Sequence, residues 1–91
     1  MGGMSVYKNK NKNGTLNLSG PHIKALRLAM KPPVSQRMLA DRLQLEGLDL
    51  DKNAIQRIEC GKRFVTDIEI IAIADTLGVS LDALLRRKNI L

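Results

Sequence analysis

Apolar residues recur along part of this chain at intervals of three and four, the spacing that gathers them on one face of a helix. One such face follows Ser35 and consists of Met38, Leu39, Leu43 and Leu45. Ser35 can accept hydrogen bonds from the free amides of a first helical turn, and Gly47 has the permissive backbone that ends a helix. The pattern predicts a helix over residues 36–46.

A second helix is predicted over residues 52–60. Asp51 can cap its first turn and Gly61 can end it. Ile55 and Ile58 are spaced to share its inward face. Two short helices joined by a turn that contains glycine form a helix-turn-helix pattern.

The outward side chains of this second helix are of the kinds that read base edges in the major groove, where Arg or Lys suits guanine and Asn or Gln suits adenine. They are Lys52, Asn53, Gln56 and Arg57. The next residues, Gly61, Lys62 and Arg63, offer a backbone amide and two cations to phosphate oxygens. Together these residues form a candidate surface for duplex DNA.

Three further helices complete the predicted fold. The earliest starts at Gly20 with Pro21 in its opening turn, because proline at that point loses no needed amide. Pro32 and Pro33 stop it. Its expected inward residues are Ile23, Leu26 and Met30.

The last two helices are marked by their caps. Thr66 followed by Glu69 is a capping-box signature, and Gly78 ends the helix that starts there. The side chains expected to face inward from it are Ile70, Ile71, Ala74 and Leu77. Ser80 can cap a final helix over residues 81–88, which closes with three cations that suit the negative end of a helix dipole.

Composition favours an all-α fold in a single domain. The 91 residues leave room for one core, and 44% of them are hydrophobic although Tyr7 and Phe64 are the only aromatics. The longest uninterrupted apolar run, residues 70–74, is far shorter than the roughly 20 residues that cross a bilayer. No secretory signal is evident. We expect a cytoplasmic, nucleoid-associated protein without a membrane span.

Catalytic and metal-binding chemistry finds little support in the sequence. His22 and Cys60 are the only histidine and cysteine, whereas a zinc site takes at least three protein ligands and a disulfide needs two cysteines. We find neither a glycine-rich phosphate loop nor a credible catalytic triad. We therefore expect no enzyme activity, no metal, no cofactor and no small-molecule ligand.

The formal charge of +6 lies mainly toward the N-terminus, since residues 1–34 contain six Lys or Arg and no acid. Residues 7–17 alternate Lys and Asn with almost nothing apolar, which predicts a mobile arm. Such an arm can follow DNA phosphates or enter a minor groove, and a solvated tail that only aids solubility is the alternative. The chain then divides into a basic arm over 1–19, a domain over 20–88 and a short tail over 89–91.

Three segments in order, SQRMLADRL, AIQRIECGKR and DIEIIAIADTLGVSLDALL, resemble the helix-turn-helix domain of the Cro and phage-repressor family, also called lambda-repressor-like. The likeness covers about residues 20–86. It implies a compact five-helix fold whose third helix enters the major groove of DNA.

The resemblance also implies roles for individual residues. Gln36 would contact the sugar-phosphate backbone, and Lys62 with Arg63 would form a loop that grips phosphates. Arg27 and Glu59 correspond to an ion pair that ties the first helix to the third. The residues at the family's base-facing positions are Lys52, Asn53, Gln56 and Arg57.

The chain departs from the family at two places. It has extra residues between Leu43 and Asp51, which we interpret as a second helix lengthened by about one turn, through Glu46, so that the turn itself stays short. Cys60 stands where the family commonly has Asn.

The leading hypothesis is a sequence-specific transcriptional regulator, a repressor of phage or mobile-element type, that binds a palindromic operator as a homodimer. The dimer surface we expect is the fifth helix with the tail through Ile90 and Leu91. The alternative is a protein-interaction adaptor or antitoxin-like subunit with secondary DNA binding. RNA binding is a third option, for which two aromatic residues supply few stacking surfaces.

Overall fold

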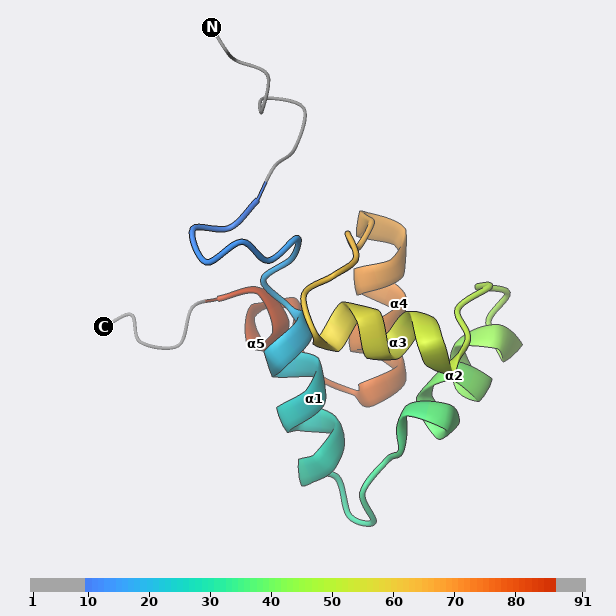
Figure 1. The fold of residues 1–91 in the computed structure, drawn as a ribbon. Helices are drawn as coiled ribbons and strands as arrows, with labels where there is room; N and C mark the ends of the chain where they lie inside the picture. Colours follow the sequence, from blue (N-terminus) through green and yellow to red (C-terminus); the bar gives the residue numbers. More distant parts are fainter. Residues whose placement is uncertain (1–9, 87–91) are drawn as a thin grey trace, which may run out of the picture.

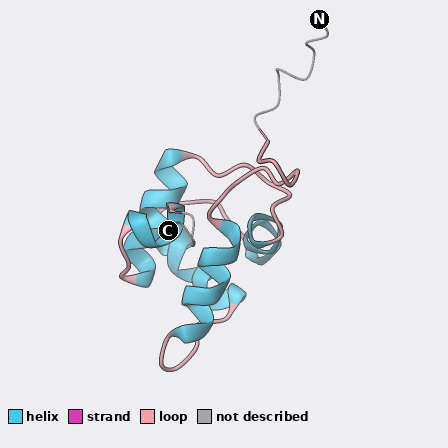
Figure 2. Ribbon diagram, turned by 90° about the vertical axis from the view of Figure 1, so that its left-hand side faces the viewer, coloured by secondary structure: helices cyan, strands magenta, loops and turns pink. Residues whose placement is uncertain are grey.

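The computed structural model describes residues 10–86, and within that range the regular elements are five α-helices and no strand (Figures 1 and 2). The helices are α1 (Gly20–Ala29), α2 (Gln36–Leu45), α3 (Lys52–Glu59), α4 (Asp67–Leu77) and α5 (Leu81–Leu85). The all-α prediction is thus confirmed for this part of the chain. None of these helices combines the length and the apolar character that crossing a bilayer requires.

The four predicted side-chain caps are all present. In each, a side-chain oxygen accepts a hydrogen bond from the backbone amide three residues further on, at 2.8–3.2 Å, and the capping residues are Ser35, Asp51, Thr66 and Ser80. The Glu69 carboxylate accepts in return from the Thr66 amide at 3.0 Å, which completes the capping box. Local side-chain chemistry therefore sets where these helices begin.

The start of α1 is held by a residue outside the helix. Its N-cap residue, Ser19, makes no capping bond, and Oδ1 of Asn17 accepts instead from the Gly20 amide at 2.8 Å. Gly20 is needed here for space, because a Cβ at this position would run into the carbonyl oxygen of Ile58. The N-terminus of α1 consequently packs directly against the end of α3.

The core lies between the five helices, and the inner side of α3 packs against α1 and α2. Helix pairs in contact are α2 with α3, α1 with α3, α1 with α5, α2 with α4 and α4 with α5. The large apolar side chains with almost no exposure are Ile23, Leu39, Leu43, Leu50, Ile55, Ile58, Ile73 and Leu84. Every helix contributes to this set, so none can be removed without opening the core.

The buried stripe of α2 is narrower than predicted. Leu39 and Leu43 are fully buried, but Met38 and Leu45 lie on the surface, and Leu45 is 86% exposed. The helix ends at Leu45, one residue before the predicted end, and the link to α3 spans residues 46–51. That link is longer than the short turn we expected.

Hydrogen bonds fold the link back onto α2. The Leu48 amide donates to the carbonyl of Leu43 at 3.0 Å, and Nε2 of Gln44 donates to the carbonyl of Leu50 at 3.1 Å. Leu50 is itself buried in the core. The extra residues therefore pack beside the two helices instead of separating them.

The predicted inward face of α4 is correct at Ile70, Ala74 and Leu77 but wrong at Ile71, which is 49% exposed. Ile73 takes the inward position and is fully buried. The physical reason is that residues 68–74 are apolar at every position except Glu69, so their spacing alone does not select a face.

The fifth helix is shorter than predicted. It ends at Leu85, and Arg86 already has an extended backbone. The remaining predicted positions through Lys88, and the tail residues Ile90 and Leu91, lie outside the described residues.

Ile55→Ala is expected to destabilise the protein by about 2–5 kcal/mol, because it empties a fully buried position. Urea unfolding measures the loss. Ile68, which is 68% exposed on α4, provides the matched control, since trimming an exposed side chain changes stability by about 0.5 kcal/mol or less. Equal losses in the two variants would contradict the packing described here.

Candidate nucleic-acid interface

α3 has one buried side and one exposed side. Its buried residues are Ala54, Ile55, Ile58 and Glu59. The exposed side carries what we call the polar row: Lys52, Asn53, Gln56 and Arg57. All four were predicted from the sequence to face outward, and all four are exposed. An anchored helix thus presents side chains suited to base edges along one side.

A buried ion pair joins α1 to α3. Nε of Arg27 donates to Oε2 of Glu59 and Nη2 donates to Oε1, both at 2.8 Å, so the pair is bidentate. The two side chains are only 6% and 3% exposed. The pair that the resemblance implied is therefore present, and it fixes α3 relative to α1.

The same cluster reaches the start of α2. Nη1 of Arg27 donates to the carbonyl of Val34 at 2.8 Å, and Nε2 of Gln36 donates to Oε1 of Glu59 at 3.0 Å. Three helices therefore meet at one carboxylate. Gln36 was expected to contact the sugar-phosphate backbone of DNA. In this structure its side-chain amide donates a hydrogen bond to Glu59 within the domain.

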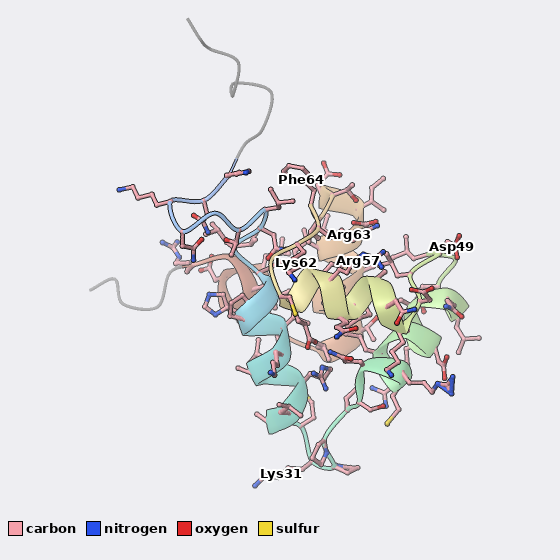
Figure 3. The ribbon with its side chains drawn as sticks, in the orientation of Figure 1. Lys31, Asp49, Arg57, Lys62, Arg63 and Phe64 are labelled. Atoms are coloured by element: carbon pink, nitrogen blue, oxygen red, sulfur yellow. The ribbon has the colours of Figure 1, made fainter. Side chains whose placement is uncertain are left out.

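In the loop after α3, the two cations predicted to contact phosphates have different surroundings. Lys62 is exposed, as expected (Figure 3). Arg63 instead turns back to α4, where Nη1 and Nη2 reach the Glu69 carboxylate at 3.0 and 3.2 Å, and Nη1 also donates to the carbonyl of Phe64. In this structure Arg63 ties the loop to α4, and its contact with a phosphate stays a prediction.

The Arg63–Glu69 pair alters the acidity of both groups. The hydrogen bond from Arg63 lowers the pKa of the Glu69 carboxyl, and bonds from Thr66 and the charge of Arg63 add to this effect against the opposing influence of partial burial. The same hydrogen bond raises the pKa of Arg63. The pair therefore favours the ionised form of the carboxyl and stabilises the start of α4.

The end of the N-terminal segment is hydrogen-bonded to α3 and to the loop after it. This differs from the predicted mobile arm over residues 7–17, which was expected to be free of the domain. The Leu16 amide donates to the carbonyl of Gly61 at 2.8 Å. Nδ2 of Asn17 donates to the carbonyls of Ile58 and Arg63, at 3.0 and 2.7 Å. Residues 1–9 of the predicted arm lie outside the described residues. At Leu16 and Asn17 the chain is bonded to the domain.

Gly61 allows this close approach. Its backbone has a φ of 77°, and a Cβ there would lie 2.6 Å from a carbon of the Thr15 side chain. Any larger residue would be strained by its own backbone and would push the N-terminal segment away.

Sequence reasoning missed Asn17 as a structural residue. The signal available was an Asn three residues before Gly20 and Pro21, where a helix starts, since Asn side chains readily bond to nearby backbone amides. The donor bonds of Asn17 to residues more than 40 positions away had no such local signal.

No protein-family model, no curated protein and no solved structure matches this chain. The function must accordingly be inferred from the geometry of its own residues.

Glu59→Ala is expected to destabilise the protein by about 3–5 kcal/mol, because it leaves the buried guanidinium of Arg27 without a counter-charge. The double variant Arg27→Met, Glu59→Met is expected to regain most of that stability, since both charges are then absent. Urea unfolding of the two variants provides the comparison. A double variant as unstable as the single one would show that the unpaired charge is not the cause.

Acid should weaken the Arg63–Glu69 tie. Because the pKa of Glu69 is lowered in the folded state, the stability from this pair is present above the ordinary value of 4.5 and is lost as the pH falls through the lower, folded value. Unfolding measured between about pH 6 and pH 3 should show a smaller acid loss for Glu69→Gln, which keeps the capping acceptor. The pair is partly solvated, so we expect a difference of about 1 kcal/mol or less; identical acid profiles would contradict it.

Proposed function

We propose that this protein binds double-stranded DNA with sequence preference and regulates transcription as a repressor that occupies an operator. The observation that carries the proposal is the polar row on α3, which is exposed while the opposite side of the helix is locked into the core. Its side chains supply the donors and acceptors that guanine and adenine edges require in the major groove. The proposal is of a binding protein and not of an enzyme.

Contacts to phosphates would position α3 in the groove. Lys62 lies three residues after the end of α3 and is exposed, so it is well placed for a sequence-independent contact. Gln36 is the first residue of α2. It would contact the sugar-phosphate backbone of DNA if its side-chain amide donated to a phosphate in place of Glu59. The resemblance of residues 20–86 to the Cro and phage-repressor family supports the same arrangement and suggests a regulator of phage or mobile-element type.

One domain of this size reaches only a few base pairs, so the proposal includes two copies on a palindromic operator. Half-site centres would lie about 34–36 Å apart, or a multiple of that spacing, so that both third helices enter the groove from one side of the duplex. Occupation of such a site excludes polymerase and requires no ligand.

Variants of Arg57 and Lys62 separate base contact from phosphate contact. Arg57→Ala should weaken binding to the preferred duplex by about 1–3 kcal/mol and relax preference at one base pair, because it removes a base-edge donor. Lys62→Ala should weaken all sequences alike and reduce the salt slope by about 1. Selection from a random duplex pool, followed by titration at several salt concentrations, measures both effects.

Unchanged base preference in Arg57→Ala would mean that α3 does not read the duplex. A pool that yields no enriched sequence for the unmodified protein would overturn sequence-specific binding altogether.

A second function is favoured by a different surface. The outer side of α4 and the link after α2 enclose a groove of about 300 Å³. Its lining includes the apolar Leu48, Ile68 and Ile71 and the acids Glu46 and Asp75. A protein-interaction subunit would use such a groove. A stoichiometric protein partner released by Ile71→Glu, together with DNA binding that lacks sequence preference, would favour this second function over the first.

A further inference from the structure

The segment before α1 is built as a defined turn. Asn11 and Thr15 close it: the Asn11 amide donates to the Thr15 carbonyl at 2.8 Å, the Gly14 amide to the Asn11 carbonyl at 2.9 Å, and Nδ2 of Asn11 to the Thr15 hydroxyl at 3.1 Å. The Thr15 hydroxyl donates in turn to Oδ1 of Asn13 at 2.8 Å. We call residues 10–17 the N-terminal turn.

The Asn17 side chain links the N-terminal turn to α1, to α3 and to the loop after α3. Its Nδ2 donates to the carbonyl of Ile58, in the last turn of α3, and to that of Arg63 in the following loop, while its Oδ1 caps α1. With the Leu16–Gly61 backbone bond, these contacts set the turn against the residue that precedes Lys62. The turn and the loop after α3 are therefore hydrogen-bonded to each other, and their ribbons run close together in Figure 1.

The N-terminal turn and the loop after α3 carry exposed positive charge. Lys10 and Lys12 are exposed on the turn, and the sequence contains no acid before Asp41. The ion pairs among the described residues are Arg27–Glu59, Arg63–Glu69 and Arg86–Asp82, and none of them includes a lysine of the turn or Lys62. Arg63 is bonded to Glu69 on α4, whereas Lys10, Lys12 and Lys62 are exposed on two segments that are hydrogen-bonded to each other.

We infer that the N-terminal turn is a second phosphate-contacting element, in which Lys10 and Lys12 bind the duplex backbone beside the phosphate reached by Lys62. Asn17 is the positioning residue that holds this element in place. The inference rests on the proposed function and adds to it a separate, sequence-independent contact. A turn already fixed to the domain loses less conformational freedom on binding than a mobile arm does, so its contacts contribute more affinity.

The test is the salt dependence of duplex binding. Each phosphate contact that is lost lowers the slope of log K against log salt by about 0.9. We expect that reduction in Lys10→Gln and in Lys12→Gln, and about twice the reduction in the double variant, with the same sequence preferred as before. Lys31→Gln removes one equal charge at the far end of α1 (Figure 3) and should leave the slope unchanged.

Asn17→Ala tests the positioning role. In this background the double lysine variant should change the slope by clearly less than it does in the unmodified protein, because a released turn no longer holds its cations at the phosphates. An equal change in both backgrounds would overturn the role of Asn17. If Asn17→Ala does not fold, the lysine variants alone decide the inference.

The possible failures are distinguishable. Unmodified protein that binds duplex with sequence preference, combined with an unchanged slope in both lysine variants, overturns the second phosphate contact and leaves the proposed function standing. Absence of duplex binding by the unmodified protein overturns both. A slope that falls equally in Lys31→Gln overturns the inference as well, because the effect is then one of net charge.

Discussion

The buried pair of Arg27 and Glu59 is the interaction on which the arrangement of the helices depends. A charge removed from water must find its counter-charge and hydrogen-bond partners, and this pair does so through two short bonds at almost no exposure. Val34 and Gln36 bring the start of α2 to the same point. Because the geometry of a bidentate pair tolerates little displacement, the orientation of α3 against α1 and α2 is set, and so is the side that α3 turns to solvent.

Neutral hydrogen bonds add to the ion pair at the same, C-terminal end of α3. Asn17 donates to two carbonyls there and caps α1 with its side-chain oxygen, so an uncharged side chain also links α1 to α3. The result is a division of the cations near α3. Arg27 and Arg63 are used internally by carboxylates, whereas Lys62 and the lysines of the N-terminal turn are left on the surface. Exposed cations beside an exposed polar helix are the charge pattern that the proposed contact with a polyanion requires.

Local chemistry explains what the sequence predicts well. Ser35, Asp51 and Thr66 lie three residues from the amides they cap, so their role can be recognised within one turn of chain. The two faces of α3 are also predictable, since Ile55 and Ile58 are its only large apolar residues.

The rest depends on contacts that no short window contains. The partners of Asn17 are more than 40 residues away, and the Lys and Asn composition of its segment suggests solvation instead. Arg63 meets Glu69 across a loop whose path follows from packing. The face of α4 depends on which isoleucines the neighbouring helices cover.

Methylation interference tests most directly whether the side of α3 opposite the ion pair faces base edges. Methyl groups on guanine N7 project into the major groove, whereas those on adenine N3 lie in the minor groove. One experiment on a selected duplex therefore distinguishes binding in the major groove from binding in the minor groove. We predict that N7 methylation at conserved guanines of the half-sites prevents binding. Binding unaffected by N7 methylation, or blocked only from the minor groove, would contradict the proposed placement of α3 in the major groove.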